Sequence, residues 1–237
     1  MQAPKSNGTA LRLACALLVG IALGLGGWWS LMVSHATEDG ERLAAEYQRG
    51  YEKGYADHVW VQDKPAEKSG IMPLFLQKDS QWSDVVYSDG TIGTYGCGLT
   101  AAAMAVNYLT TDHITPSDLL SKVGESCLSD RVNDMSKFTS WLTEHYAGLG
   151  RLDTFWGIDD ALKYVDEGWL VFGGMGGSLG DRTYGGHIIL IWKSNGDGTY
   201  LIRDSDDGSN SIKVWTRDEL EEVEWGSFNA IKNQDKE

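Results

Sequence analysis

The sequence predicts an α+β domain, because segments with helical signals come first along the chain and segments with strand signals follow them. Helices are expected between residues 97 and 167, and strands between residues 169 and 215. This order does not fit the alternating βαβ units of a parallel sheet. We place the domain at residues 71–237, after a polar linker at residues 64–70 (KPAEKSG).

Each predicted helix has its own signal. Residues 97–109 (CGLTAAAMAVNYL) are apolar on nearly every side, so this helix must be buried. Thr115 and Pro116 form a typical N-cap followed by a first helical position. Two further helices are expected at residues 134–146 and 158–167.

Short runs of apolar and aromatic residues predict four strands, at residues 169–172, 187–193, 200–204 and 211–215. The turn residues 195–198 (NGDG) predict a hairpin between the second and third strands. The glycine-rich segment 173–186 lacks the spacing of a dinucleotide-binding fingerprint. We expect it to be a flexible loop that binds substrate.

Composition and charge narrow the class of protein. With 237 residues, of which 42% are hydrophobic, the chain can form a sizeable core. Its 20 Lys and Arg face 34 Asp and Glu, a net charge of −14, which argues against nucleic acid as a partner. Three cysteines (Cys15, Cys97 and Cys127) are too few for a disulfide framework, so packing must hold the core.

An uncharged apolar segment lies near the N-terminus. Residues 13–33 (LACALLVGIALGLGGWWSLMV) are long enough to cross roughly 30 Å of hydrocarbon as a helix, which predicts a transmembrane signal anchor. Lys5 and Arg12 precede this segment, so residues 1–12 should form a cytoplasmic tail. The protein is then a single-pass protein of the cell membrane, with its C-terminal domain outside.

The alternative for this segment is a signal peptide cleaved after Ala36, which would make the protein secreted. Its apolar length exceeds the usual range of about 7 to 15 residues, which favours the anchor. Residues 34–70 are expected to be an extracytoplasmic stalk and linker. Tyr47, Tyr51 and Tyr55 would share one helical face, which fits either a spacer or a docking surface.

Cys97 is the first candidate for chemistry, because it lies between Gly96 and Gly98 at the first turn of the buried helix. Unpaired backbone N–H groups and the helix dipole favour the thiolate there, as a nucleophile requires. The glycines would let a substrate backbone approach closely. The position alone also fits a disulfide with Cys127 or an inert core cysteine, so three interpretations stay open.

His187 is the second candidate, because it begins a buried strand directly after the glycine-rich segment 173–186. A histidine at the mouth of such a strand can face a cleft, which suits a general base. The alternative is a histidine that only caps the strand. Asp204 ends the neighbouring strand of the predicted hairpin, where its carboxylate would orient the imidazole.

Asp204, Asp206, Asp207, Gly208 and Asn210 look superficially like a calcium loop. The oxygen-ligand spacing that an EF-hand requires is absent, so no metal site is expected. No cofactor is expected either.

These motifs together resemble a known family. The pieces QKDSQW, TIGTYGCGLTAAAMAVNYL and ITP, within residues 77–116, are similar to the stand-alone papain-like cysteine peptidases related to the bacteriocin-processing peptidases that cut after double-glycine leaders. The later pieces ALKYVDEGWLVFGG, GGHIILIW and YLIRDS follow in the same order. The likeness covers roughly residues 71–205 and implies a papain-like fold.

Carried over position by position, the resemblance implies that Cys97 is the nucleophile and His187 the general base. It implies that Asp204 orients His187 and that Gln77 donates a hydrogen bond to the oxyanion. Gln81 is a second candidate for the donor. Ser205 follows Asp204 where the family commonly has proline.

The expected protein is a membrane-anchored extracytoplasmic cysteine peptidase that hydrolyses peptide bonds in a peptide or protein substrate. Two alternatives remain. One is an amidase or transpeptidase that acts on cell-wall peptide, and the other is a peptide-binding module that kept the fold without turnover.

Overall fold

The computed structural model describes residues 72–235, and these form an α+β domain as the sequence predicts. The predicted cytoplasmic tail, membrane anchor, stalk and linker, residues 1–70, lie outside the described residues. Within 72–235, no helix combines the length and the apolar character that a membrane span needs.

The elements keep one set of labels throughout. The helices are α3 (Ile92–Tyr95), α4 (Cys97–Leu109), α5 (Pro116–Val123), α6 (Met135–His145), α7 (Ile158–Asp166), α8 (Gly208–Ile212) and α9 (Arg217–Glu221). The strands are β1 (Val86–Tyr87), β2 (Gly90–Thr91), β3 (Leu128–Ser129), β4 (Val132–Asn133), β5 (Leu149–Phe155), β6 (Leu170–Leu179), β7 (Arg182–Ser194), β8 (Thr199–Asp204), β9 (Val214–Thr216) and β10 (Glu224–Asn233).

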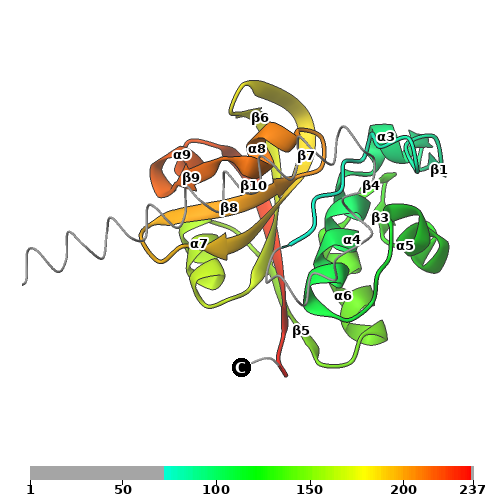
Figure 1. Cartoon of the computed structure of the whole chain (residues 1–237), viewed down its shortest axis with the longest axis horizontal. Helices are drawn as coiled ribbons and strands as arrows, with labels where there is room; N and C mark the ends of the chain where they lie inside the picture. The colour runs from blue at the N-terminus through cyan, green and yellow to red at the C-terminus, as the bar shows by residue number, and fades with distance from the viewer. Residues whose placement is uncertain (1–71, 236–237) are drawn as a thin grey trace, which may run out of the picture. The chain divides into compact units, whose positions relative to one another are not determined.

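The main sheet has six antiparallel strands in the order β5-β10-β6-β7-β8-β9. The C-terminal strand β10 therefore lies inside the sheet, between β5 and β6. Two short hairpins, β1-β2 and β3-β4, lie apart from this sheet. Figure 1 shows α3 to α6 gathered in one half of the domain and the sheet with α7 to α9 in the other.

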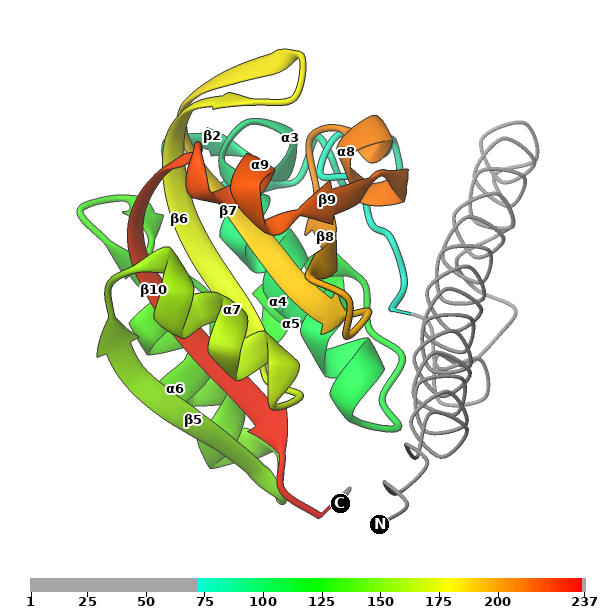
Figure 2. The same ribbon diagram turned by 90° about the vertical axis from the view of Figure 1, so that its left-hand side faces the viewer.

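Helices pack on both faces of the sheet, and alternation along β7 directs side chains to each of them. Ile189 and Ile191 belong to the buried cluster that includes Leu162 of α7. Trp192 points the other way and packs edge-on against Tyr108 of α4, with ring centroids 5.6 Å apart. Figure 2 shows α7 in front of the sheet and α4 behind it. The prediction that α4 is buried is confirmed.

Helix α5 begins as its sequence predicts. The Thr115 hydroxyl accepts a hydrogen bond from the Asp118 backbone N–H, and the Asp118 carboxylate accepts one from the Thr115 backbone N–H. This reciprocal capping box leaves Pro116 at a first-turn position, where a missing N–H costs nothing. The hairpin between β7 and β8 is also confirmed, with Gly196 and Gly198 at positive φ.

The prediction of a flexible loop at residues 173–186 is wrong, because the segment forms most of a long β-hairpin. Strand β6 continues to Leu179 and β7 starts at Arg182, and these two residues pair across the turn. Glycine has a low strand propensity, but pairing with neighbouring strands overrides it. At Gly173 the glycine is required, since an added Cβ would lie 2.6 Å from the Trp225 ring.

Three further differences concern strands of the main sheet. The strand predicted at residues 211–215 is instead the end of α8 followed by the short strand β9. Strands β5 and β10 were not predicted at all. In β5 (LGRLDTF) the large apolar residues recur at every third position, and β10 (EWGSFNAIKN) has no regular period, so neither shows the alternation or the continuous apolar run that predicts a strand.

Candidate active site

Cys97 is the first residue of α4, and Gly96 occupies the N-cap without a side chain to cap the helix. Its thiol is half-buried and free. The Asn133 side-chain amide approaches the Cys97 sulfur at 3.6 Å and also donates to the Tyr95 carbonyl at 2.7 Å. The sulfur therefore lies at a helix N-terminus with an amide donor beside it.

The two glycines next to Cys97 are required by packing inside the protein. A Cβ on Gly96 would lie 2.5 Å from the Ile92 carbonyl oxygen. A Cβ on Gly98 would lie 2.6 Å from the Asn133 Cβ. The absence of that Cβ lets Asn133 reach the sulfur.

His187 lies on β7 and is buried, with 6% of its surface exposed. Its Nε2 is 2.8 Å from Oδ1 of Asp204. Burial alone would lower the pKa of His187, but hydrogen bonds with Asp204 and Cys97 and the charges of both raise it to about 9. The imidazole therefore connects Cys97 with Asp204 and favours its protonated form at neutral pH.

Asp204 ends β8 and is completely buried. Five groups donate hydrogen bonds to its carboxylate, namely His187 Nε2, the Tyr184 hydroxyl, the Asn210 amide and the backbone N–H groups of Asp206 and Asp207. Burial alone would raise the pKa of Asp204, but the bonds from His187, Asn210 and Tyr184 hold it below its usual value. The carboxylate stays ionised beside the imidazole.

Gln77 is buried next to the end of β8. Its side-chain oxygen accepts from the Ser205 hydroxyl at 3.1 Å, and its amide nitrogen donates to the Gly93 carbonyl at 3.1 Å. Gly93 lies in α3, one turn before Cys97. Gln81 is exposed, and only its backbone N–H has a hydrogen bond, to Asp79. The geometry thus favours Gln77 over Gln81 as the residue near the candidate site.

The comparison with known proteins agrees with this geometry. A family model described as "Peptidase_C39 like family" matches residues 72–236, which is most of the chain. The chain belongs to the Peptidase_C39 like family. None of the curated proteins compared with the chain matches it significantly. The fold and the family are those of papain-like cysteine peptidases that resemble the bacteriocin-processing enzymes.

Within this Peptidase_C39 like domain, the second cysteine differs from the first. Cys127 is buried and free, so the disulfide with Cys97 that the sequence left open is not formed. Burial raises the pKa of Cys127, which favours the unreactive thiol.

The loop after Asp204 carries ion pairs. Asp206 pairs with both Lys78 and Arg182, and Asp207 pairs with Arg182 at 3.1 Å. These pairs link the segment that carries Gln77, the tip of the β6-β7 hairpin and the end of β8. Among residues 72–235, no group of three or more His, Cys, Asp or Glu is arranged to hold a metal ion.

Sequence reasoning missed three residues of this Peptidase_C39 like site. Tyr184 stacks on the His187 ring, with centroids 4.3 Å apart and an interplanar angle of 8°. Asn210 donates to Asp204, and Asn133 contacts Cys97. Tyr184 lies three residues before His187, and this closeness in sequence is the only signal that could have indicated it as a site residue. Asn133 and Asn210 come from loops and short elements that no sequence pattern connects with the site.

Proposed function

We propose that the chain is a cysteine peptidase in which Cys97 is the nucleophile, His187 the general acid and base, Asp204 the residue that orients His187, and Gln77 an oxyanion donor. The observation that carries this proposal is the position of His187. Its ring is hydrogen-bonded to Asp204 at 2.8 Å and also forms a hydrogen bond with Cys97. A chain of carboxylate, imidazole and thiol is the arrangement that activates sulfur nucleophiles.

The reaction begins with attack of the Cys97 thiolate on the carbonyl carbon of the peptide bond. The carbonyl oxygen gains the negative charge, and N–H donors must stabilise it. One hydrogen of the Gln77 amide is held by Gly93, which leaves the other for this oxyanion. The first N–H groups of α4, beginning at Cys97, have no acceptor within the helix and supply the second donor.

His187 then gives its proton to the leaving amine, and the C–N bond breaks to leave a thioester on Cys97. In the second half of the cycle, a water molecule loses a proton to His187 and attacks the thioester carbon. The carboxylic acid product leaves, and the thiolate and the imidazolium are restored. The raised pKa of His187, about 9, suits a group that must hold a proton at neutral pH before the first step.

The test is covalent labelling of the full-length chain with a thiol-directed peptidase probe, together with cleavage of a peptide library. Cys97→Ser should lose both labelling and cleavage. Cys127→Ser is the matched control and should keep most of both. Absence of labelling and cleavage in the wild-type chain would favour a binding module without turnover.

Product analysis separates hydrolysis from the related chemistries. Cleavage in the presence of an added amine should yield mainly the free carboxylic acid if the enzyme is a peptidase. A dominant amide product would identify a transpeptidase. Activity on cell-wall peptide alone, with none on linear library peptides, would favour the amidase alternative.

We further propose that residues 13–33 anchor the domain in the cell membrane, with residues 71–237 outside. The support is the uncharged length of that segment, with Lys5 and Arg12 before it. Protease added to intact cells should remove the domain and leave a short protected N-terminal fragment. A mature N-terminus at Thr37 would instead establish a cleaved signal and a secreted protein.

A further inference from the structure

A pocket of about 390 Å³ lies between the sheet and the N-terminus of α6. The volume falls within the range of about 300 to 1,000 Å³ that is usual for ligand sites. Its floor crosses four adjacent strands, with one side chain or glycine from each of β5 and β6, Ile188 from β7, and Ser227 and Asn229 from β10. Its roof is formed by the β3-β4 hairpin and by Asp134, Met135 and Ser136.

The pocket adjoins the candidate active site at Asn133, and a second lining residue is next to His187 in the chain. Asn133 lines it and also contacts the Cys97 sulfur at 3.6 Å. Ile188 lines it and directly follows His187 along β7. A side chain in this pocket therefore belongs to a substrate residue close to the bond that Cys97 would attack.

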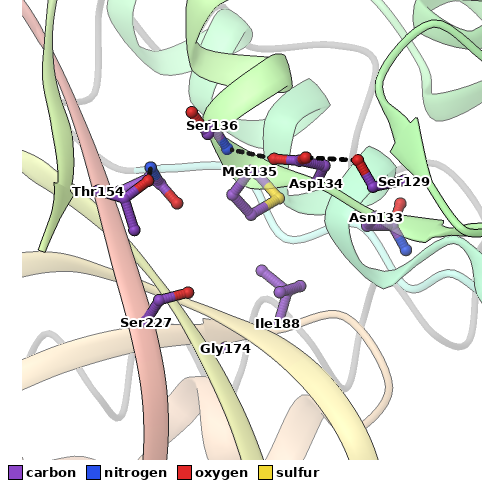
Figure 3. A pocket seen from close by; sticks show the side chains of 10 residues that line it. Ser129, Asn133, Asp134, Met135, Ser136, Thr154, Gly174, Ile188 and Ser227 are labelled. Carbon is purple, nitrogen blue, oxygen red and sulfur yellow. Dashed lines mark hydrogen bonds between the residues drawn. The ribbon is translucent and has the colours of Figure 1, made fainter. Parts of the chain in front are cut away.

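The pocket offers hydrogen-bonding groups that are not used within the domain. Among residues 72–235, the hydroxyls of Ser136 and Ser227 and the side-chain oxygen of Asn229 have no hydrogen-bond partner. The Thr154 hydroxyl accepts from the Asn229 amide at 2.9 Å, so its own hydrogen remains available. Figure 3 shows the Ser227 hydroxyl pointing into the pocket. The available groups include both donors and acceptors.

The single carboxylate in the pocket lining, that of Asp134, already has hydrogen-bond partners within the domain. Asp134 is the only ionisable residue in the lining, and no Lys or Arg lines it. Its carboxylate accepts hydrogen bonds from the backbone N–H groups of Ser136 and Lys137 and from the Ser129 hydroxyl. It caps α6, and therefore needs no cation from a ligand. An anionic ligand would meet this charge without a counter-charge in the lining.

Met135 and Ile188 reach into the pocket from opposite sides, as Figure 3 shows. They provide apolar contacts for methylene groups, whereas the free hydroxyls and Asn229 suit a polar end that both donates and accepts. A carboxamide has this combination, because its NH₂ donates and its oxygen accepts. We propose that this pocket is a substrate subsite for a carboxamide side chain, glutamine or asparagine, next to the scissile bond. The inference rests on the proposed peptidase function.

The experiment uses the best-cleaved library peptide of the full-length chain, resynthesised with Gln, Leu or Glu at each position near the scissile bond. Leu has a similar size without hydrogen bonds, and Glu replaces the amide with a charge. At one position, kcat/KM for Gln should exceed that for Leu by about five- to a hundredfold, as expected for about two added hydrogen bonds. Glu should be at least as poor as Leu.

Pocket variants connect this preference to the named residues. In the double variant Ser136→Ala with Ser227→Ala, the ratio of Gln to Leu should fall to within about threefold, because the free hydroxyls are gone. Ser140→Ala, one turn further along α6 and outside the lining, should leave the ratio unchanged. A preference for Leu or Glu at every position, or a ratio unaffected by the double variant, would overturn the inference.

A third variant narrows the pocket instead of removing its polar groups. A Cβ on Gly174 would meet nothing closer than 3.6 Å, so Gly174→Val can fold while its side chain occupies pocket volume. It should reduce cleavage of the Gln peptide more than of a peptide with Ala at that position. An equal effect on both peptides would contradict the assignment.

Binding to the Cys97→Ser chain separates this inference from the proposed function. If library peptides with Gln bind this chain more tightly than their counterparts with Leu while the wild-type chain cleaves no library peptide, the subsite stands and the peptidase proposal fails. If the wild-type chain cleaves both peptides equally and the Cys97→Ser chain binds both equally, the peptidase stands and the subsite fails.

Discussion

The backbone N–H of Gln77 donates to the Ser205 carbonyl oxygen at 2.8 Å, and the Ser205 hydroxyl donates to the Gln77 side-chain oxygen at 3.1 Å. These two bonds join the first described segment of the chain to the residue that follows Asp204. They fix which way the Gln77 amide is turned, because its oxygen is held by Ser205. Its NH₂ group is consequently turned toward α3, where it donates to the Gly93 carbonyl.

Replacing Ser205 with alanine should loosen this orientation. We expect Ser205→Ala to lower kcat by about two- to tenfold with little change in KM, because one hydrogen bond to the Gln77 oxygen is lost. Steady-state kinetics on a library peptide measure this. Ser209→Ala is a suitable control, since the Ser209 hydroxyl is exposed and bonds only to Asp207. A kcat equal to wild type would show that Ser205 does not position Gln77.

Removing the Gln77 side-chain amide should lower kcat more than removing the Ser205 hydroxyl. Gln77→Ala should lower kcat by about a hundred- to a thousandfold, which is the usual effect of losing one oxyanion donor. Gln81→Ala should have no effect, because Gln81 is exposed. The opposite pattern in the two kcat values would move the oxyanion donor to Gln81 and leave the rest of the mechanism intact.

Tyr184 contacts His187 and Asp204 and would affect catalysis through them, so the pH dependence of activity is the measurement that tests its role. Tyr184→Phe keeps the stacking on His187 but loses the 2.7 Å bond to Asp204. Because that bond helps to hold the pKa of Asp204 down, activity should begin to fall at a higher pH on the acid side. Tyr184→Leu should lower kcat further, since the stacking is lost as well. Identical pH profiles for wild type and Tyr184→Phe would argue against this positioning role.

At Asp204, asparagine should retain more activity than alanine. The remaining oxygen of Asp204→Asn can still accept from His187, and its NH₂ can donate to the Tyr184 hydroxyl oxygen. The lost negative charge should lower the pKa of His187, so activity should decline at a lower pH on the basic side. The pH dependence of kcat/KM for the two variants and the wild type checks both statements. Equal activity of Asp204→Asn and Asp204→Ala would refute them.

The same histidine makes stability depend on pH. Since the pKa of His187 is raised from 6.5 to about 9 on folding, its contribution is complete below pH 6.5 and is lost as the pH rises to 9. The free energy of unfolding should fall by on the order of 3 kcal/mol across this window. Urea unfolding at both pH values, followed by tryptophan fluorescence, measures the change. His187→Asn should show a much smaller difference, and an equal difference would assign the dependence to other groups.

The predictable parts of the fold were those with local signals. The apolar run of α4, the cap of Thr115 and the turn before Thr199 each depend on residues close in sequence. The β6-β7 hairpin could not be predicted in this way, because its strands are held by distant partners; an added Cβ on Gly173, for example, would collide with the ring of Trp225 on β10. Strand β10 was not predicted for the same reason, because it is held in the sheet by pairing with β5 and β6, which are distant in sequence.

The candidate site shows the same division. Cys97 and Asp204 were found because they begin and end recognisable elements. His187 was found because it precedes the apolar run of β7, although β7 begins at Arg182 and not at His187 as predicted. Asn133 was not found, since it reaches Cys97 only because Gly98 lacks a side chain, and this contact spans 36 residues along the chain. Such contacts are properties of the folded surface and leave no periodic pattern in the sequence.

The central place of β10 also bears on how the protein matures. Strand β10, residues 224–233, follows every other described strand in sequence, yet it lies between β5 and β6 in the sheet. The sheet therefore closes around a strand that is synthesised after its neighbours, through contacts of long sequence separation, which form slowly. The floor of the pocket beside Cys97 includes Ser227 and Asn229 and is incomplete until that moment. A chain that ended before residue 224 would carry Cys97 without Ser227 and Asn229, and so without part of the pocket beside it.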